Sequence, residues 1–124
     1  MGEFNANDRK HLVTLQGTPY ITVVGLQARM VDQGKAIVET FTELLSNPYD
    51  NSDAAVVRFS AWVLDKNGNR HGPFVALGDA SAANVGPKLK EALIRMAETR
   101  AFGRVLRIIT RSPYTALEEL PPSE

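Results

Sequence analysis

Residues 55–77 read AVVRFSAWVLDKNGNRHGPFVAL and predict a β-hairpin. The first half alternates two kinds of side chain, as a strand with one buried face does: Val57, Phe59, Ala61 and Val63 against Arg58, Ser60 and Trp62. Asn67-Gly68 is the dipeptide most typical of a tight hairpin turn. The strand expected over residues 74–77 should therefore pair antiparallel with the strand over residues 55–64.

Upstream of this hairpin, the sequence predicts a strand, a helix and a second strand. Apolar residues at helical spacing indicate a helix from Thr22 to Gln33, and Gly34 supplies the left-handed residue that ends it. β-Branched and aromatic residues predict a strand over residues 37–45. The remaining segments are a short strand over 11–16, a turn over 17–19 and a loop over 47–53.

Downstream of the hairpin, one long helix is expected from Pro87 to about Thr110, because proline favours the first helical position. Residues 78–81 are expected to lead into a helix start, with Ser81 as its N-cap. The expected order is therefore β-α-β-β-β-α. This is an α+β domain with an antiparallel sheet packed against one long C-terminal helix.

The length of 124 residues predicts one domain over residues 10–111, between a flexible N-terminus (1–9) and an acidic tail (112–124). The chain has no cysteine, which excludes disulfides, cysteine nucleophiles and thiolate metal sites. No stretch approaches the ~20 apolar residues of a membrane span, and the N-terminus lacks the apolar core of a secretory signal. We therefore expect a cytoplasmic protein with no membrane partner.

The charges balance over the whole chain but not along it. Fourteen Lys and Arg residues match fourteen Asp and Glu residues, for a net charge of zero. Residues 88–111 nevertheless hold seven basic and two acidic side chains, whereas residues 112–124 hold three glutamates and no basic side chain. The expected long helix is thus the candidate for binding an anionic partner.

Motifs for catalysis and metal binding are absent from the sequence. Asp65–Asn69 opens like a calcium loop, but Arg70 and Ala76 stand where that loop requires Gly and Glu. His11 and His71 have no partner at metal-ligand spacing. We expect no catalytic residue, no cofactor and no metal, and hence no enzyme. The scattered aspartates leave a remote alternative, a nuclease or hydrolase: Asp50, Asp53, Asp65 and Asp79.

Four arginines of the expected helix fall within a sector roughly 60° wide on an ideal helical wheel: Arg100, Arg104, Arg107 and Arg111. An apolar stripe occupies another face: Ala97, Ala101, Val105 and Ile108, with Ile94 and Ile109 nearby. The arginine stripe is easier to understand if it meets an anion. Three alternatives stay open: a solvated face, compensation of the helix dipole, or pairing with Glu118, Glu119 or strand acids.

Arg58 and Trp62 give a second indication of nucleic-acid binding. Both are expected on the strand face opposite Phe59, where a tryptophan beside an arginine could stack nucleobases. The alternative is that Trp62 belongs to the core or to a contact between subunits.

Residues 96–107 read MAETRAFGRVLR and resemble the long-helix motif of the Rad52 superfamily of single-strand annealing proteins. That motif has an alanine-rich approach, a threonine and then Lys/Arg-Arg-x-Leu-Arg. The β-β-β-α order expected over residues 37–110 is also similar to the core of that family. The resemblance maps the family's DNA-binding basic pair onto Arg104 and Arg107, while Gly103 stands where the family has a lysine.

The resemblance implies a Rad52-like fold that binds single-stranded DNA and anneals strands in recombination or repair. Such a protein would need no nucleotide or metal and would form a homo-oligomer such as a ring. The expected nucleic-acid-binding residues are Arg104, Arg107, Arg100, Arg111, Arg58 and Trp62. The alternative is a non-catalytic oligomeric scaffold of the same fold, with its arginines in salt bridges between subunits.

Overall fold

The computed structural model describes residues 10–50, 54–81 and 90–120, which form an α+β fold. Its elements in chain order are β1 (Leu12–Leu15), β2 (Thr18–Ile21), α2 (Val23–Asp32), β3 (Ala36–Ser46), β4 (Ala54–Leu64), β5 (Arg70–Ser81), α4 (Lys90–Thr110), β6 (Thr115–Ala116) and the short 3₁₀ helix η1 (Leu117–Glu119).

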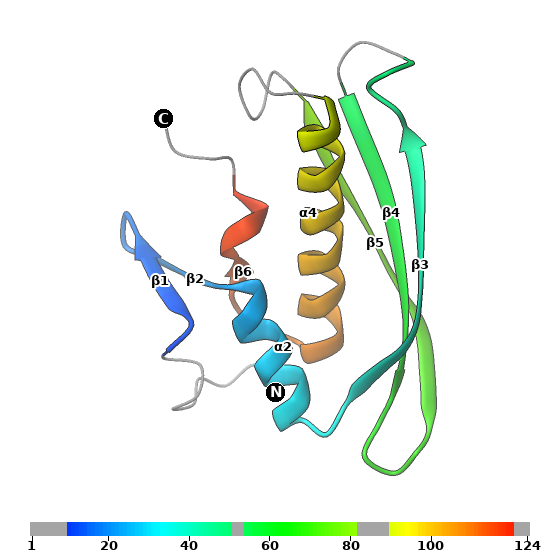
Figure 1. Ribbon diagram of the computed structural model, residues 1–124. Coiled ribbons are helices and arrows are strands. Elements are labelled where there is room, and N and C mark those ends of the chain that lie inside the picture. The colour runs from blue at the N-terminus through cyan, green and yellow to red at the C-terminus, as the bar shows by residue number, and fades with distance from the viewer. Residues whose placement is uncertain (1–9, 51–53, 82–89, 121–124) are drawn as a thin grey trace.

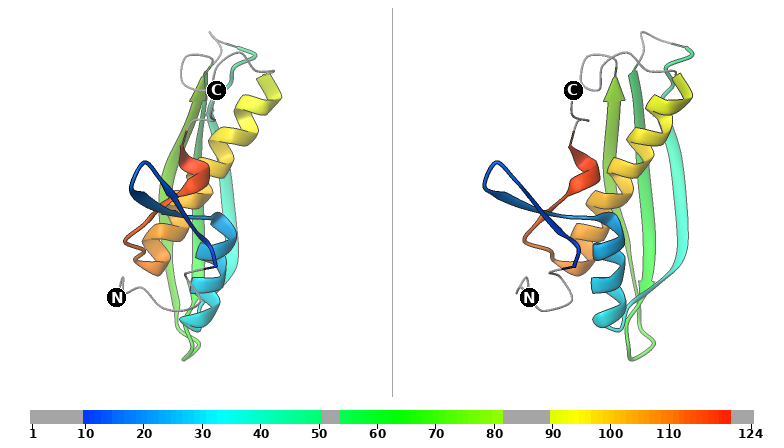
Figure 2. Two further views of the ribbon diagram at one scale, coloured as in Figure 1. Left: turned by 90° about the vertical axis from the view of Figure 1, so that its left-hand side faces the viewer. Right: turned by 60° about the vertical axis from the view of Figure 1, so that its left-hand side comes forward.

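The long strands form one antiparallel sheet in the order β3-β4-β5. Helix α4 lies along one face of this sheet, and α2 with β1, β2 and β6 lies on the other side of α4 (Figure 1). Two further views show α4 running obliquely along the strands (Figure 2). The opposite face of the sheet, called the open face below, carries no other described element.

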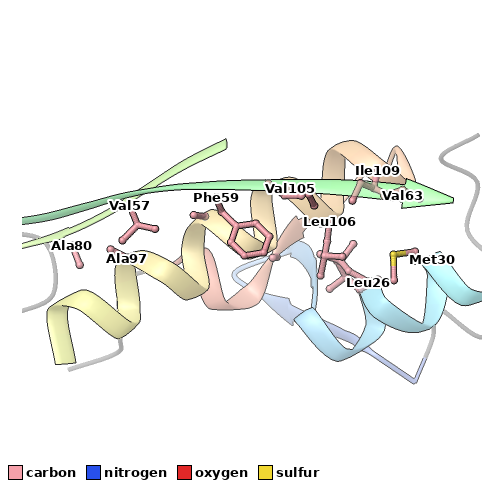
Figure 3. Close-up of a cluster of buried hydrophobic side chains, with 14 of the residues drawn as sticks. Leu26, Met30, Val57, Phe59, Val63, Ala80, Ala97, Val105, Leu106 and Ile109 are labelled. Carbon is pink, nitrogen blue, oxygen red and sulfur yellow. The ribbon is translucent and has the colours of Figure 1, made fainter. Parts of the chain in front are cut away.

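The alternation predicted in β4 is confirmed. Val57, Phe59, Ala61 and Val63 are buried against α4, where Ala97, Ala101 and Val105 are also fully buried. Helix α2 adds Leu26 and Met30, which lie beside Leu106 at the other end of the core (Figure 3). The core is therefore continuous from the sheet, along α4, to α2.

The predicted hairpin joins β4 to β5. Gly68 has a φ of +82°, and the Asp65 carboxylate accepts hydrogen bonds from the backbone N–H groups of Asn67 and Asn69 at 2.9 and 3.0 Å. These bonds hold Asp65 in a turn and lower its pKa to about 2, with the His71 side chain as the largest cause.

Residues 78–81 belong to β5, which is longer than the strand expected over residues 74–77. The helix expected to follow Ser81 lies outside the described residues. Gly78 faces α4 at very close range: a Cβ there would lie 2.1 Å from the Ala97 carbonyl oxygen and 2.4 Å from the Ala101 nitrogen. Glycine at this position thus serves close packing of helix on strand rather than a turn. The expected helix start at Pro87 lies outside the described residues; α4 is described from Lys90.

A second correction concerns the first hairpin. The turn expected over residues 17–19 lies one position earlier, at Gln16 and Gly17, whose φ angles are 51° and 82°. Thr18 already begins β2, which pairs antiparallel with β1 and parallel with β6. The order of the described elements is thus β-β-α-β-β-β-α-β, with a second, mixed sheet, rather than β-α-β-β-β-α.

Helix α2 begins and ends where the sequence predicts. The Thr22 hydroxyl accepts a hydrogen bond from the Gly25 N–H at 3.0 Å and caps the N-terminus. Gly34 follows the helix with a φ of +73°. This orientation of α2 brings Lys35 close to the last turn of α4, where its Nζ donates to the Ile109 carbonyl at 2.9 Å.

Candidate functional site

Arg100, expected on an exposed stripe, is buried with 4% of its surface accessible. Its Nη1 donates to the Asp79 carbonyl at 2.7 Å and its Nη2 to the Leu120 carbonyl at 3.4 Å. Burial lowers the pKa of the guanidinium, while the nearby Asp79 charge raises it. Arg100 therefore connects α4 to β5 and to the C-terminal segment, and it presents little surface to a partner.

Arg104 repeats this contact one helical turn later, because its Nη1 donates to the Leu77 carbonyl at 2.7 Å. Four helical residues span about 6 Å, and two strand residues span about 6.8 Å. This near match lets Arg100 and Arg104 reach alternate carbonyls of β5, the end strand of the sheet. The two arginines thus occupy polar groups that an edge strand otherwise leaves unpaired.

Arg104 and Arg107 share the carboxylate of Glu119, whose side chain is 5% exposed. Arg104 Nε and Arg107 Nη2 donate to Oε1 at 3.1 and 2.7 Å, and Arg107 Nε lies 2.7 Å from Oε2 without the angle of a hydrogen bond. Oε2 instead accepts from the Ala116 N–H at 3.0 Å. Internal pairing, one of the three alternatives, therefore accounts for part of the stripe.

Both arginines still reach solvent, since about a third of each side chain is exposed, 35% for Arg104 and 33% for Arg107. The Asp79 carboxylate also lies 4.0 Å from Arg104 Nη1. Together with Arg100, the cluster holds three guanidinium groups and two carboxylates, which leaves one net positive charge. They lie beside a surface groove, called the basic groove below, whose lining residues are Ala76, Arg104, Arg107, Ile108 and Ser112.

The fourth arginine, Arg111, lies beyond the end of α4 and lines a neighbouring cavity of about 240 Å³. This terminal pocket is lined by Lys35, Val63, Asp65, His71, Phe74, Ile108, Ile109 and Arg111. Ile108 lines both cavities and is 49% exposed, so its expected place in the buried stripe is wrong; Ile109 is buried instead. The basic groove and the terminal pocket are therefore adjacent.

Lys35 is a member of this site that the sequence pattern missed. Its Nζ also donates to the Gln33 side-chain oxygen at 3.1 Å. Burial is the main cause that lowers the pKa of Lys35, and the charges of Arg111 and Arg29 add to it. Positive charge is thus concentrated at this end of α4, although Arg111 lies far from Arg29 and Lys35 in the sequence.

Arg58 and Trp62 lie elsewhere, on the open face of the sheet, as the alternation predicts. Arg58 is paired with Glu43, with Nε and Oε1 2.7 Å apart. The Arg70 guanidinium lies 5.7 Å from the centre of the Trp62 ring and is paired with Glu39. The six expected residues therefore divide between two surfaces of the molecule, and the charges on the open face are matched in pairs.

No family model, curated protein or solved structure matches this chain. Over residues 10–50, 54–81 and 90–120, no three His, Asp or Glu side chains gather as a metal site would require. Within the same residues, no helix has the length and apolar character needed to cross a membrane.

Proposed function

We propose that this chain is a Rad52-like protein that binds single-stranded DNA through the basic groove and assists strand annealing. The observation that carries the proposal is the side-by-side arrangement of Arg104 and Arg107, each partly exposed and held in place by Glu119. These are the two positions onto which the resemblance maps the family's basic pair.

Glu119 supports this function by positioning the two guanidinium groups rather than by cancelling them. Each guanidinium has five N–H donors in a fixed fork. The hydrogen bonds among the described residues use Nε and Nη1 of Arg104 and Nη2 of Arg107. The remaining N–H groups can donate to a phosphate oxygen, and the ordering cost of the side chains has already been met in the fold.

Phosphate contacts of this kind suit annealing. They hold a strand by its backbone and carry no sequence information, so the base edges stay available to pair with a second strand. The proposal needs no covalent step. Annealing would follow from concentrating and aligning strands on more than one protomer.

The test is a salt titration of oligonucleotide binding, followed by fluorescence anisotropy, with the variant R104Q/R107Q/E119Q. This variant replaces Arg104, Arg107 and Glu119 together with uncharged amides, and replacing the members of an ion-pair cluster together is less damaging than removing one of them. For single strands, log affinity falls with log salt by about 0.7 per phosphate contact. The variant should therefore lose affinity and about 1.4 of the slope.

The matched control is E43Q/R58Q, which removes an ion pair from the open face and leaves the basic groove unchanged. It should bind DNA like the parent protein. Trp62 fluorescence gives a second readout, because this side chain lies on the open face and should not be quenched by a strand in the groove. A normal slope in the cluster variant, or loss of binding confined to the control, would overturn the proposal.

A second candidate function is the non-catalytic oligomeric scaffold, and the observation that favours it is the apolar character of the open face. Phe41, Val75 and Leu77 are 55%, 42% and 49% exposed there. Large apolar side chains gathered on one surface are typical of protein interfaces. In this scaffold the contact between subunits would use the open face, because Arg104 and Arg107 already pair within the chain.

A further inference from the structure

The residues that line the terminal pocket carry an excess of positive charge. Lys35 and Arg111 both line it, and Arg29 lies close enough to influence Lys35. Asp65 is the one acidic residue among the described residues that line it, and that carboxylate is engaged by His71 at 2.8 Å as well as by backbone N–H groups. An anion entering the pocket would therefore meet two cations, with the single carboxylate already hydrogen-bonded.

Arg111 occupies a backbone position that normally belongs to glycine. Its φ is +54°, and the next residue, Ser112, donates its N–H to the Arg107 carbonyl at 3.1 Å. This is the arrangement in which a left-handed residue, usually glycine, ends a helix. An arginine here adopts an unfavourable conformation, and it makes no hydrogen bond or ion pair with any other described residue. Its side chain therefore gives the helix end no hydrogen bond and only the favourable interaction of a cation with the helix dipole.

Lys35 also keeps capacity to bind a ligand. Its ammonium group has three donors, and two of them reach the Ile109 carbonyl and the Gln33 side chain. These two contacts fix the ammonium group at the pocket. Its third N–H remains for an acceptor within the cavity.

The rest of the lining indicates what the anion is attached to. Val63, Phe74, Ile108 and Ile109 form an apolar wall in a cavity of about 240 Å³, which is small for a ligand site. We infer that the terminal pocket binds the phosphate group of a nucleotide through Lys35 and Arg111, with the sugar or base against the apolar wall. The identification of this nucleotide as part of a DNA strand rests on the function proposed above. The affinity of the pocket for a nucleotide phosphate is independent of that function.

The test is a titration of the full chain with thymidine monophosphate, followed by two-dimensional amide NMR. The amide signals of Lys35, His71 and Arg111 should shift together. Thymidine, which lacks the phosphate, and inorganic phosphate, which lacks the apolar part, should each bind more weakly. The variant Arg111→Gly should weaken binding about tenfold or more, as loss of a hydrogen bond to a charged group does. Its melting temperature should equal or exceed that of the parent protein, because glycine suits the backbone at this position.

The matched control is Arg95→Gln, which removes one positive charge from the same helix at a position that lines a different cavity. It should bind thymidine monophosphate normally. The inference is overturned if thymidine binds as well as its monophosphate, if inorganic phosphate alone binds as well, or if Arg111→Gly and Arg95→Gln behave alike. The cluster variant R104Q/R107Q/E119Q should keep this pocket, so a failure of DNA binding in the groove remains distinguishable from a failure of the pocket.

Discussion

Gly78 is the residue at which α4 and the sheet come closest together. The space for its missing Cβ is filled by the backbone of Ala97 and Ala101. Backbone atoms cannot move aside as a flexible side chain can, so any side chain at residue 78 must push the helix away from β5. That displacement would also strain the hydrogen bonds from Arg100 and Arg104 to the carbonyls of the same strand.

Gly78→Ala should therefore lower the free energy of unfolding by about 3 kcal/mol, the upper part of the usual range for overpacking. The matched control is Gly17→Ala, where no atom lies within 4 Å of the added Cβ and the cost comes from a φ of +82°. That cost is about 1 kcal/mol. Urea unfolding of both variants measures the difference, and equal losses would contradict the close packing at Gly78.

The sequence does not reveal this role of Gly78. Residues 78–81 combine Gly, Asp and Ser, which are typical turn residues, so the sequence does not predict that they continue β5. The sequence likewise offers several acidic residues as partners of the arginines, and Glu119 is only one of them. Glu119 becomes the partner of Arg104 and Arg107 because η1 runs back along α4, and no local sequence pattern predicts such a contact.

At the level of elements, α4 packs against the sheet with one face and binds its edge strand with another. One face supplies the apolar side chains of the core, and the neighbouring face supplies arginines that bind the outer carbonyls of β5. An unprotected edge strand is a site for unwanted pairing with another chain. The arginines therefore contribute to the fold itself as well as to the surface charge.

Replacement of Arg100 tests this role, because Arg100 is the buried member of the pair. Arg100→Met keeps the length and apolar stem but leaves the carbonyls of Asp79 and Leu120 without these donors. The free energy of unfolding should fall by about 3 kcal/mol, since hydrogen bonds to charged groups contribute about 1.5–3 kcal/mol. Arg100→Lys keeps one charged donor group and should lose less. If urea unfolding shows that Arg100→Met is as stable as the parent protein, the hydrogen bonds from Arg100 to β5 do not stabilise the fold.

Elements with a strong internal pattern were predicted well. The alternation in β4, the Asn-Gly turn and the Gly34 that ends α2 each depend on neighbouring residues, and all three are confirmed. Strand β6 has only two residues and exists because it pairs with β2, nearly a hundred positions earlier. The basic groove and the terminal pocket are likewise formed by residues from separate elements, so the sequence identified their arginines but not Lys35, and it offered Glu119 only as one of several partners.

At the scale of the whole molecule, two surfaces with different chemistry lie on different sides of the large sheet. The basic groove and the terminal pocket lie along α4 and carry an excess of positive charge. The open face is apolar, and its arginines are paired with Glu43 and Glu39. Excess charge suits a polyanion, whereas an apolar surface with matched charges suits another protein. One protomer could therefore hold a strand on one side and a second copy of the chain on the other.

The last prediction follows from this separation. The double variant F41S/L77S removes two large apolar side chains from the open face, and both are already about half exposed. The fold of the protomer should survive, because little surface that is buried within the protomer is lost. Multi-angle light scattering should find an oligomer for the parent protein and a 13.6 kDa monomer for the variant. The monomer should bind single strands with an unchanged salt slope per protomer but should anneal them poorly, since annealing requires strands held on several protomers. A parent protein that is itself monomeric at micromolar concentration would contradict the role of the open face, and a variant that loses DNA binding would contradict the separation of the two surfaces.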